Sequence, residues 1–352
     1  MIPQNRLRML DEPSMHQVKL LPEGAVLPCP ESQTLLDACI AAGVPISYNC
    51  RSGECGECMA SLVAGQVHEL PGADPAIFTA AHRAQGKILT CMCFPRSALT
   101  VDIPLQADAP AIRPAAVNAM VQRVEQLTPT IYGVAVETPW PIEFYAGQAF
   151  EWVVPGIVPN RTYSAANCPG SDVIEFHVRV YPGGKIGAFV TDLTAGQPLQ
   201  LIGPYGQFRL SPNDWRPALC VAGGTGLAPV MSLLEHAAAV GDRRAIRLFY
   251  GARSQDELYC IDRIKALGER LVNFAFTPVL SDEPQDSGWS GARGLVTDTL
   301  AAEVGDAFGL EAYLCGPPLM IDAALEVLTR FGALEQDIRS DRFVQAKAPT
   351  RA

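Results

Sequence analysis

The chain has 352 residues, of which 48% are apolar and 18% are charged, and its formal net charge is -10. This length favours two or three domains over one, and the composition is ordinary for folded domains with their own cores. The acidic balance argues against nucleic-acid binding, because it leaves few cations to neutralise phosphates.

Two segments of the chain indicate where in the cell the protein is found. The first ten residues carry two arginines but no apolar run of signal-peptide length. Residues 217–234 are free of charge over the length of a membrane helix, but Gly223, Gly224, Gly226 and Pro229 favour a buried strand, a turn and a new helix. We therefore expect a cytoplasmic protein without a membrane span, in which the eleven cysteines do not form a disulfide framework.

Residues 15–105 are predicted to form a small β-rich domain. A strand is expected over residues 16–21, and a helix over residues 34–42 ends at Gly43. A loop rich in cysteine and glycine follows, and the alternation of Leu99, Val101, Ile103 and Leu105 predicts a half-buried closing strand. Residues 107–116 are rich in alanine and proline and are predicted to be a linker.

Residues 116–211 contain short strand-like runs separated by glycine and proline, which indicates an antiparallel β-barrel. The clearest run covers residues 173–180, and one helix is expected near residues 187–193. In residues 215–352 the pattern changes to apolar runs at 218–224, 246–252, 274–280 and 312–318 that alternate with helical stretches. This alternation predicts an α/β domain with a parallel sheet, so three domains are expected in all.

Four cysteines form the pattern C-x4-C-x2-C followed by a distant cysteine, which is the spacing of plant-type [2Fe–2S] ligands: Cys50, Cys55, Cys58 and Cys91. Gly53 and Gly56 permit the tight turns that point backbone amides at the sulfurs. Structural zinc is the alternative, but zinc usually takes paired C-x2-C elements and the chain has one. Cys93 competes with Cys91 for the fourth position, and Cys91 is preferred because it directly follows the apolar run. At these residues the chain resembles the ferredoxin domains fused to flavin reductases.

The sequence Arg161-Thr-Tyr163-Ser164 offers a cation, an aromatic plane and a hydroxyl in one strand. A flavin nucleotide needs these groups for its pyrophosphate, its ring and its reactive edge, although a chance match in a strand is the alternative. The string resembles the R-x-Y-S motif of the ferredoxin–NADP reductase superfamily. That resemblance implies FAD, with Arg161 at the pyrophosphate, Tyr163 against the isoalloxazine and Ser164 in a catalytic position near N5.

Two further segments resemble flavin-binding parts of this superfamily. Residues 177–187 correspond to a region that gives backbone amides to the flavin phosphates at a helix N-terminus, although a plain turn at the glycines is the alternative. Gly187 replaces a hydroxyl residue common in relatives, so its contact would be through the backbone. The resemblance assigns to the flavin His177, Val178, Arg179, Gly184, Lys185, Ile186 and, near the end of the chain, Phe343.

The glycine-rich residues 223–229 follow an apolar run and open a helix, so the backbone can approach a pyrophosphate closely at a helix N-terminus. They resemble the G-G-T-G-x-A-P motif of the superfamily, and residues 315–320 resemble its C-G-P-P-x-M motif. The resemblance implies that Cys315 lies beside the nicotinamide in a steric and electronic role, as a catalytic residue but not a nucleophile. The nicotinamide site would comprise Gly223, Gly224, Thr225, Gly226, Cys315, Gly316 and Pro317.

Coenzyme choice is predicted from residues 281–283. Where NADP-dependent relatives place a cation after a serine, this chain has Ser281, Asp282 and Glu283. Acidic groups repel a 2′-phosphate and accept a hydrogen bond from a ribose hydroxyl, which favours NADH. Arg253 is the opposing cation, and it is followed by Asp256 and Glu257.

The predicted cofactors have a chemical order. A nicotinamide gives up two electrons as hydride and an iron–sulfur cluster accepts one at a time, whereas a flavin does both. Electrons are therefore expected to pass from NADH through FAD and the [2Fe–2S] cluster to a partner.

The resemblance covers nearly all of the chain after Met15, and the domain order is similar to that of reductase components of bacterial Rieske-type, aromatic-ring-hydroxylating oxygenases, such as terephthalate and benzoate dioxygenase reductases. It implies a β-grasp-like ferredoxin domain, a terminal oxygenase as the protein partner and a monomer. Reductases of cytochromes P450 or of diiron monooxygenases are similar and remain alternatives. So do a redox sensor or electron carrier without NADH turnover, and a zinc-binding regulatory protein.

Overall fold

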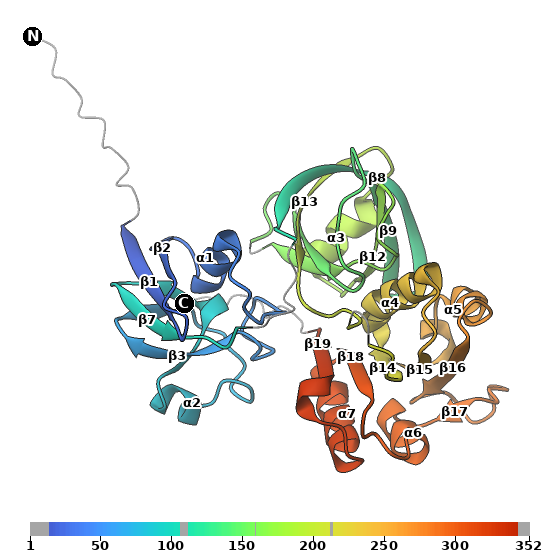
Figure 1. Ribbon diagram of the computed structural model, residues 1–352. Helices are drawn as coiled ribbons and strands as arrows, with labels where there is room; N and C mark the ends of the chain where they lie inside the picture. The colour runs from blue at the N-terminus through green and yellow to red at the C-terminus, as the bar shows by residue number, and fades with distance from the viewer. Residues whose placement is uncertain (1–13, 106–111, 159, 212–213, 344–352) are drawn as a thin grey trace, which may run out of the picture. The chain divides into compact units, whose positions relative to one another are not determined.

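The computed structural model describes residues 14–105, 112–158, 160–211 and 214–343 (Figure 1). Internal contacts separate the chain into two units, residues 1–111 and 112–352. Each unit has its own sheets and its own core, so each is described by itself.

The first unit is built on a mixed five-stranded sheet with the order β2-β1-β7-β3-β5. Its strands are β1 (Met15–Leu21), β2 (Val26–Pro30), β3 (Met59–Ala64), β5 (Lys87–Leu89) and β7 (Leu99–Asp102), and β1 and β7 are parallel. The predicted closing strand is shorter than expected, because it ends at Asp102 and Leu105 only bridges to Ile46.

The predicted helix of this unit is confirmed as α1 (Leu35–Ala42), and its ends are set by local chemistry. Thr34 caps it by accepting a hydrogen bond from the Asp37 amide at 3.1 Å, and Gly43 ends it at a φ of 73°. A short helix, α2 (Ala80–Ala84), and a two-stranded sheet of β4 (Val67–Glu69) and β6 (Cys93–Pro95) complete the unit, with a 3-10 turn at Thr90–Met92.

The second unit begins with a six-stranded antiparallel barrel in the order β11-β10-β13-β8-β9-β12. The strands are β8 (Ala115–Thr128), β9 (Ile131–Glu137), β10 (Ala149–Val153), β11 (Arg161–Ser164), β12 (Val173–Arg179) and β13 (Pro198–Tyr205). A bridge between Ala165 and Phe176 closes the barrel, and the Ala166 amide donates to the Glu175 carbonyl at 2.7 Å. The predicted barrel is confirmed, and its helix, α3 (Lys185–Asp192), begins two residues earlier than expected.

The linker predicted for residues 107–116 is wrong at its C-terminal end. Ala115 and Ala116 belong to β8, where they pair with Gly203 and Ile202, and residues 107–111 lie outside the described residues. Alanine and proline content suggested a linker, but backbone pairing with β13 decides the conformation, because a small side chain does not prevent a strand from forming there.

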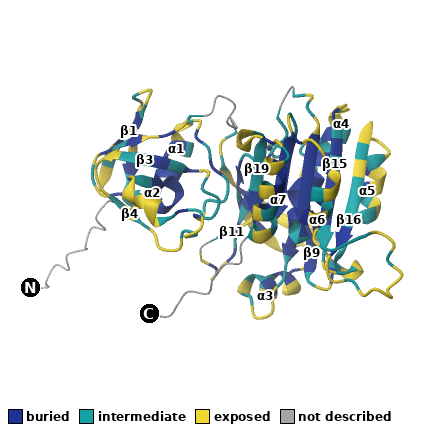
Figure 2. Cartoon of the chain, turned by 90° about the horizontal axis from the view of Figure 1, so that it is seen from below, coloured by how far each residue is buried: buried dark blue, intermediate teal, exposed yellow. Residues whose placement is uncertain are grey.

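The rest of the second unit is a parallel sheet in the order β17-β16-β15-β14-β18-β19. Its strands are β14 (Ala218–Gly223), β15 (Ala245–Ala252), β16 (Asn273–Leu280), β17 (Ala292–Arg293), β18 (Glu311–Gly316) and β19 (Ile338–Arg342). Helices α4 (Leu227–Val240) and α5 (Ile261–Gly268) cover one face, and α6 (Val296–Glu303) and α7 (Pro318–Arg330) cover the other. The central strands β14 and β18 are buried along their whole length, and Figure 2 shows exposed residues on the outer side of helix α5.

The strand order places a crevice at a defined point of this sheet. The chain runs outward from β14 through β15 and β16, and then returns to the other side of β14 as β18. Ligands of open α/β sheets bind outside the carboxyl ends of the strands where the order reverses. The loops that follow Gly223 in β14 and Gly316 in β18 therefore face the expected binding site.

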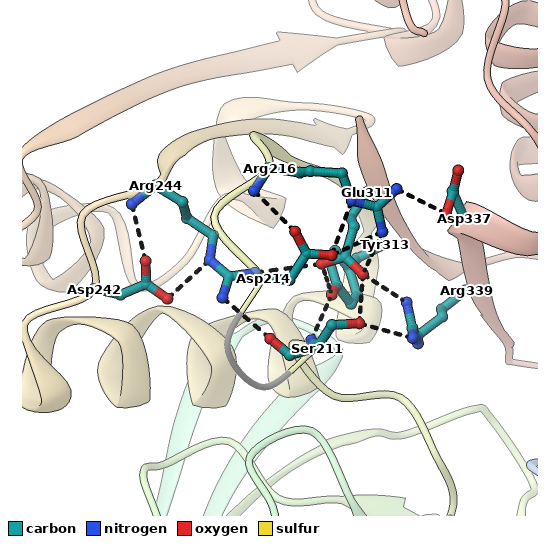
Figure 3. Close-up of polar contacts among 9 residues, drawn as sticks. All are labelled: Ser211, Asp214, Arg216, Asp242, Arg244, Glu311, Tyr313, Asp337 and Arg339. Carbon is teal, nitrogen blue, oxygen red and sulfur yellow. Dashed lines mark hydrogen bonds and ion pairs between the residues drawn. The ribbon is translucent and has the colours of Figure 1, made fainter. Parts of the chain in front are cut away.

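A buried carboxylate lies at the amino ends of the strands, opposite the crevice, and binds groups from several of them (Figure 3). Glu311 is the first residue of β18 and is 0% exposed. Its oxygens lie 3.1–3.3 Å from guanidinium nitrogens of Arg216, Arg244 and Arg339, and they accept hydrogen bonds from the hydroxyls of Ser211 and Tyr313. Asp214 and Asp337 pair with Arg216, and Asp242 pairs with Arg244. The network joins the starts of β14, β15, β18 and β19 to the segment that follows the barrel.

Replacement of Glu311 by alanine is expected to lower the free energy of unfolding of the second unit by about 3–5 kcal/mol, because it removes the carboxylate that three guanidinium groups share and leaves the buried Arg244 guanidinium with Asp242 as its remaining carboxylate partner. All four tryptophans lie in this unit, at positions 140, 152, 215 and 289, so urea unfolding followed by tryptophan fluorescence reports on it alone. Glu326→Ala, at an exposed position of α7, is the control. Equal midpoints for both variants would contradict the role given to the network.

Candidate functional site

The four motif cysteines of the first unit form two pairs. The Sγ atoms of Cys58 and Cys91 are 3.2 Å apart and buried. In the second pair, the Cys50 sulfur accepts from the Cys55 thiol and from the amides of Ser52 and Glu54, at 3.3–3.5 Å for the amides. The Cys55 hydrogen bond is the main cause that lowers the pKa of Cys50 to about 5, and the two amides add to it.

The cysteine loop is shaped by residues with positive φ. Gly53 and Gly56 have φ values of 81° and 78°, and a side chain on Gly56 would meet Ile77 at 2.9 Å. Arg51 also has a positive φ, of 57°, and its guanidinium holds Asp37 in the first turn of α1 at 2.7 Å. The loop is thus tied to the helix beside it.

These pairs fit a binuclear cluster. Within the described ranges no three His, Cys, Asp or Glu side chains are grouped to hold a single metal ion. The thiols instead stand two by two, and a [2Fe–2S] cluster takes two protein ligands on each iron. Cys93 is the first residue of β6, where it pairs with Glu69, and burial raises its pKa to about 12. Of the two candidates for the fourth position, Cys91 is therefore the one beside Cys58.

The Arg-x-Tyr-Ser motif occupies the whole of β11. Arg161 and Tyr163 are half-buried on one side of the strand and Ser164 is buried on the other, as the alternation predicts. The Tyr163 ring lies 4.7 Å from the Trp152 ring, centroid to centroid, and burial raises the pKa of its hydroxyl above its usual range. A rigid aromatic surface beside a guanidinium fits a flavin nucleotide.

Ser164 meets a residue that the sequence analysis missed. Its hydroxyl donates to Asp341 Oδ2 at 3.4 Å, from a strand 177 positions away. Asp341 lies in β19 opposite Cys315 of β18, so the pairing of the strands brings the three residues together. Burial raises the pKa of Cys315 far above its ordinary value, which keeps the thiol neutral and agrees with a steric role. The only sequence signal was the position of Asp341 two residues before Phe343.

Of the residues after β11 that were predicted to bind the flavin, some lie in the protein interior and others lie at the start of helix α3. His177 is buried, and its imidazole contacts Glu175 Oε1 at 3.2 Å and the Tyr259 hydroxyl at 3.1 Å, so its side chain is engaged within the protein. Val178 is also in the core. Helix α3 begins at Lys185 after Gly184, and no side chain caps its N-terminus among the described residues. Its first amides, including that of Ile186, are donors suited to a phosphate.

Close packing around residue 187 explains why it is a glycine. A side chain there would lie 2.8 Å from Val180 Cγ1 and 3.3 Å from the Tyr181 carbonyl oxygen. The packing of α3 on the end of the barrel strand therefore favours glycine.

A cleft of about 290 Å³ opens at the carboxyl ends of β14, β15 and β16. Predicted residues that line it are Arg179, Gly223, Gly224, Thr225, Ser281, Pro317 and Phe343. Arg253, Glu257, Leu295 and Met320 line it as well and were not assigned to it from the sequence. Gly226, Asp282, Cys315 and Gly316 are outside the lining, and all of these except Asp282 are buried.

The glycine-rich loop of residues 223–229, which we call the coenzyme loop, lies very close to the backbone of β18. A side chain on Gly226 would lie 2.1 Å from the Cys315 carbonyl oxygen, and one on Gly224 would lie 2.8 Å from Arg179 Nη2. Arg179 therefore packs against the coenzyme loop. The open N-terminus of α4, the glycine cradle and this guanidinium form a donor set that fits a pyrophosphate.

Three family models match successive parts of the chain. Residues 18–96 match the 2Fe-2S iron-sulfur cluster binding domain, residues 121–210 the oxidoreductase FAD-binding domain, and residues 220–326 the oxidoreductase NAD-binding domain. The fold and the site thus define an oxidoreductase that binds a [2Fe–2S] cluster, FAD and NAD(H).

Relatives narrow this class. The chain is 34% identical to the reductase component DmpP of phenol 2-monooxygenase from Pseudomonas sp. (strain CF600), over 94% of this chain and 95% of that protein. It is 34% identical to the ferredoxin–NAD(P)(+) reductase component of the naphthalene 1,2-dioxygenase/salicylate 5-hydroxylase systems from Ralstonia sp., over 88% and 93%. The crystal structure of the Amycolatopsis cytochrome P450 reductase GcoB aligns with a TM-score of 0.82 and 33% identity, over 93% of this chain and 98% of that one. The chain belongs to the family of reductase components of oxygenase systems.

In the part of the chain that the structure describes, no helix is both long enough and apolar enough to cross a bilayer.

Gly226→Ala is expected to reduce kcat/KM for NADH by about 100-fold, because the two loops must separate and a displacement near 1 Å is enough for such a loss. Stopped-flow measurement of NADH oxidation under anaerobic conditions tests this. Gly241→Ala is the control, since it strains the other end of α4 at a φ of 68° and leaves the cleft intact. Comparable rates in the two variants would show that the close approach of the loops is unimportant.

Proposed function

We propose that this protein oxidises NADH and passes the electrons singly to the terminal component of an aromatic-ring-hydroxylating oxygenase. The observation that carries the proposal is the meeting of Ser164, Cys315 and Asp341 beside a cleft with a phosphate-binding loop, in a chain that also holds two thiol pairs. The first arrangement suits hydride transfer and the second suits one-electron transfer.

The choice of partner is supported by the relatives. Phenol 2-monooxygenase, xylene/toluene monooxygenase and naphthalene 1,2-dioxygenase all act with reductases similar to this chain over most of its length. The terminal component of such a monooxygenase or dioxygenase would be the electron acceptor. We also propose a monomeric, cytoplasmic protein with domains over residues 15–105, 116–211 and 215–352.

The residues are assigned by their positions. Cys50 and Cys55 would ligate one iron, and Cys58 and Cys91 the other. Flavin binding would use the β11 residues Arg161, Tyr163 and Ser164 together with the first amides of α3. NADH binding would use the loops after β14 and β18, with Arg179 at the pyrophosphate. Asp341 would hold the Ser164 hydroxyl in place, and Cys315 would shape the floor of the cleft.

Anaerobic titration with NADH tests the proposed function. Purified protein is expected to show flavin and [2Fe–2S] absorption bands that bleach together. Cys58→Ser is expected to remove the cluster bands and the reduction of a one-electron protein acceptor, while NADH-dependent reduction of ferricyanide through the flavin remains. Cys29→Ser is the control, because this thiol contacts the carbonyls of Gln33 and Thr34 rather than a motif cysteine. Bands that NADH leaves unchanged would refute the assignment.

The link between Ser164 and Asp341 gives a separate prediction. If Asp341 acts by holding the hydroxyl, Ser164→Ala and Asp341→Asn are each expected to slow flavin reduction by NADH about tenfold or more, and the double variant to be no slower than the worse single one. Rapid-mixing kinetics at saturating NADH measure the step. Additive losses would show that the two residues act independently.

A further inference from the structure

At one end of the cleft, β15 and β16 finish side by side. Ala252 pairs with Leu280, so the next residues, Arg253 and Ser281, leave the sheet together and both line the cleft. The Asp282 amide donates to the Arg253 carbonyl at 2.8 Å, which holds the two chain segments against each other. The Arg253 side chain is 65% exposed. A guanidinium in this place is suited to a phosphate.

Glu257 occupies that guanidinium. It follows Arg253 by four residues, in the 3-10 turn Gln255–Glu257, and its Oε1 accepts from Arg253 Nε at 2.8 Å and from Nη2. The carboxylate is the less exposed partner, at 12%. Its other oxygen, Oε2, lies 3.9 Å from Arg179 Nη2. One carboxylate thus stands between the arginine at the coenzyme loop and the arginine at the far end of the cleft.

Neighbouring acids do not share this position. Glu283 is engaged by the backbone amide and side chain of Gln255, at 2.8 and 2.6 Å, so it fixes the turn that presents Glu257. Asp256 is exposed on the same turn and is not part of the cleft lining. Asp282 adds a negative charge near Arg253, and together with Glu257, the larger influence, it raises the arginine pKa.

We propose that Glu257 is a specificity-determining residue, which selects NADH over NADPH by occupying the Arg253 guanidinium that would otherwise bind a 2′-phosphate. A phosphate would have to displace a hydrogen-bonded carboxylate or approach its negative charge, and both cost binding free energy. The ribose 2′-hydroxyl of NADH is neutral and meets neither obstacle. The inference rests on the proposed function, because it assumes that this cleft takes a nicotinamide coenzyme.

The test compares kcat/KM for NADPH and for NADH in the full-length holoenzyme. Glu257→Gln keeps the shape of the side chain and removes its charge, and it is expected to raise the NADPH/NADH ratio about tenfold. Asp256→Asn makes the same change of charge one residue away and is expected to leave the ratio unchanged. Adding Arg253→Ala to Glu257→Gln is expected to abolish the gain, and Arg253→Ala alone is not expected to raise the ratio, because it leaves the negative charge of Glu257 in the cleft.

Binding of 2′,5′-ADP and of 5′-ADP, measured by calorimetry, gives a readout that does not depend on turnover. Glu257→Gln is expected to tighten 2′,5′-ADP about tenfold relative to 5′-ADP. An unchanged preference, an equal gain in Asp256→Asn, or a gain that survives Arg253→Ala would overturn the proposal. If the unaltered protein fails to oxidise NADH at all, the proposed function fails instead, and the two failures are distinguishable.

Discussion

The buried carboxylate of Glu311 is the constraint on which the catalytic half of this protein depends. Three guanidinium groups and two hydroxyls surround it, and they come from the starts of four strands and from the segment after the barrel. Because the strands are parallel, fixing their amino ends also fixes where their carboxyl ends emerge. Cys315 lies four residues along β18 from Glu311, and Asp341 lies two residues along β19 from Arg339. A polar network at the amino ends of the strands thus helps to set the positions of Cys315 and Asp341 near their carboxyl ends.

The barrel completes the proposed site through contacts with helix α4, which packs on the same sheet. The Gly147 amide donates to Ser232 Oγ in α4, and Ser232 donates to the Asn167 carbonyl at 2.6 Å. These bonds, and a core that includes Ile131 and Phe208 from the barrel segment, hold β11 where Ser164 meets Asp341. The proposed hydride-transfer site therefore draws on both the barrel and the parallel sheet. The thiol pairs, in contrast, are built wholly within the first unit, which matches the separation of two-electron from one-electron chemistry.

The charged residues at this end of the cleft come from the segments that follow β15 and β16. Parallel strands deliver the residues after β15 and β16 to one edge, and this chain places Arg253, Glu257, Ser281 and Asp282 there. Of the two residues predicted to contact the coenzyme here, Ser281 lines the cleft and Asp282 does not, and Glu257 lines it as well. The reason is the 3-10 turn after Arg253, which carries Glu257 back over the sheet edge and is held by Glu283.

The sequence by itself determined the features that depend on contiguous residues. Cysteine spacing predicted the four candidate cluster ligands, and apolar runs predicted β14, β15, β16 and β18, because both patterns can be read from the order of residues along the chain. It did not determine that β8 begins at Ala115, that His177 turns inward to Tyr259, that Asp341 meets Ser164, or that Glu257 rather than Asp256 pairs with Arg253. Those outcomes were decided by tertiary structure. Each depends on how strand pairing and turns bring side chains into contact, and the order of residues along the chain does not show which side chains will meet.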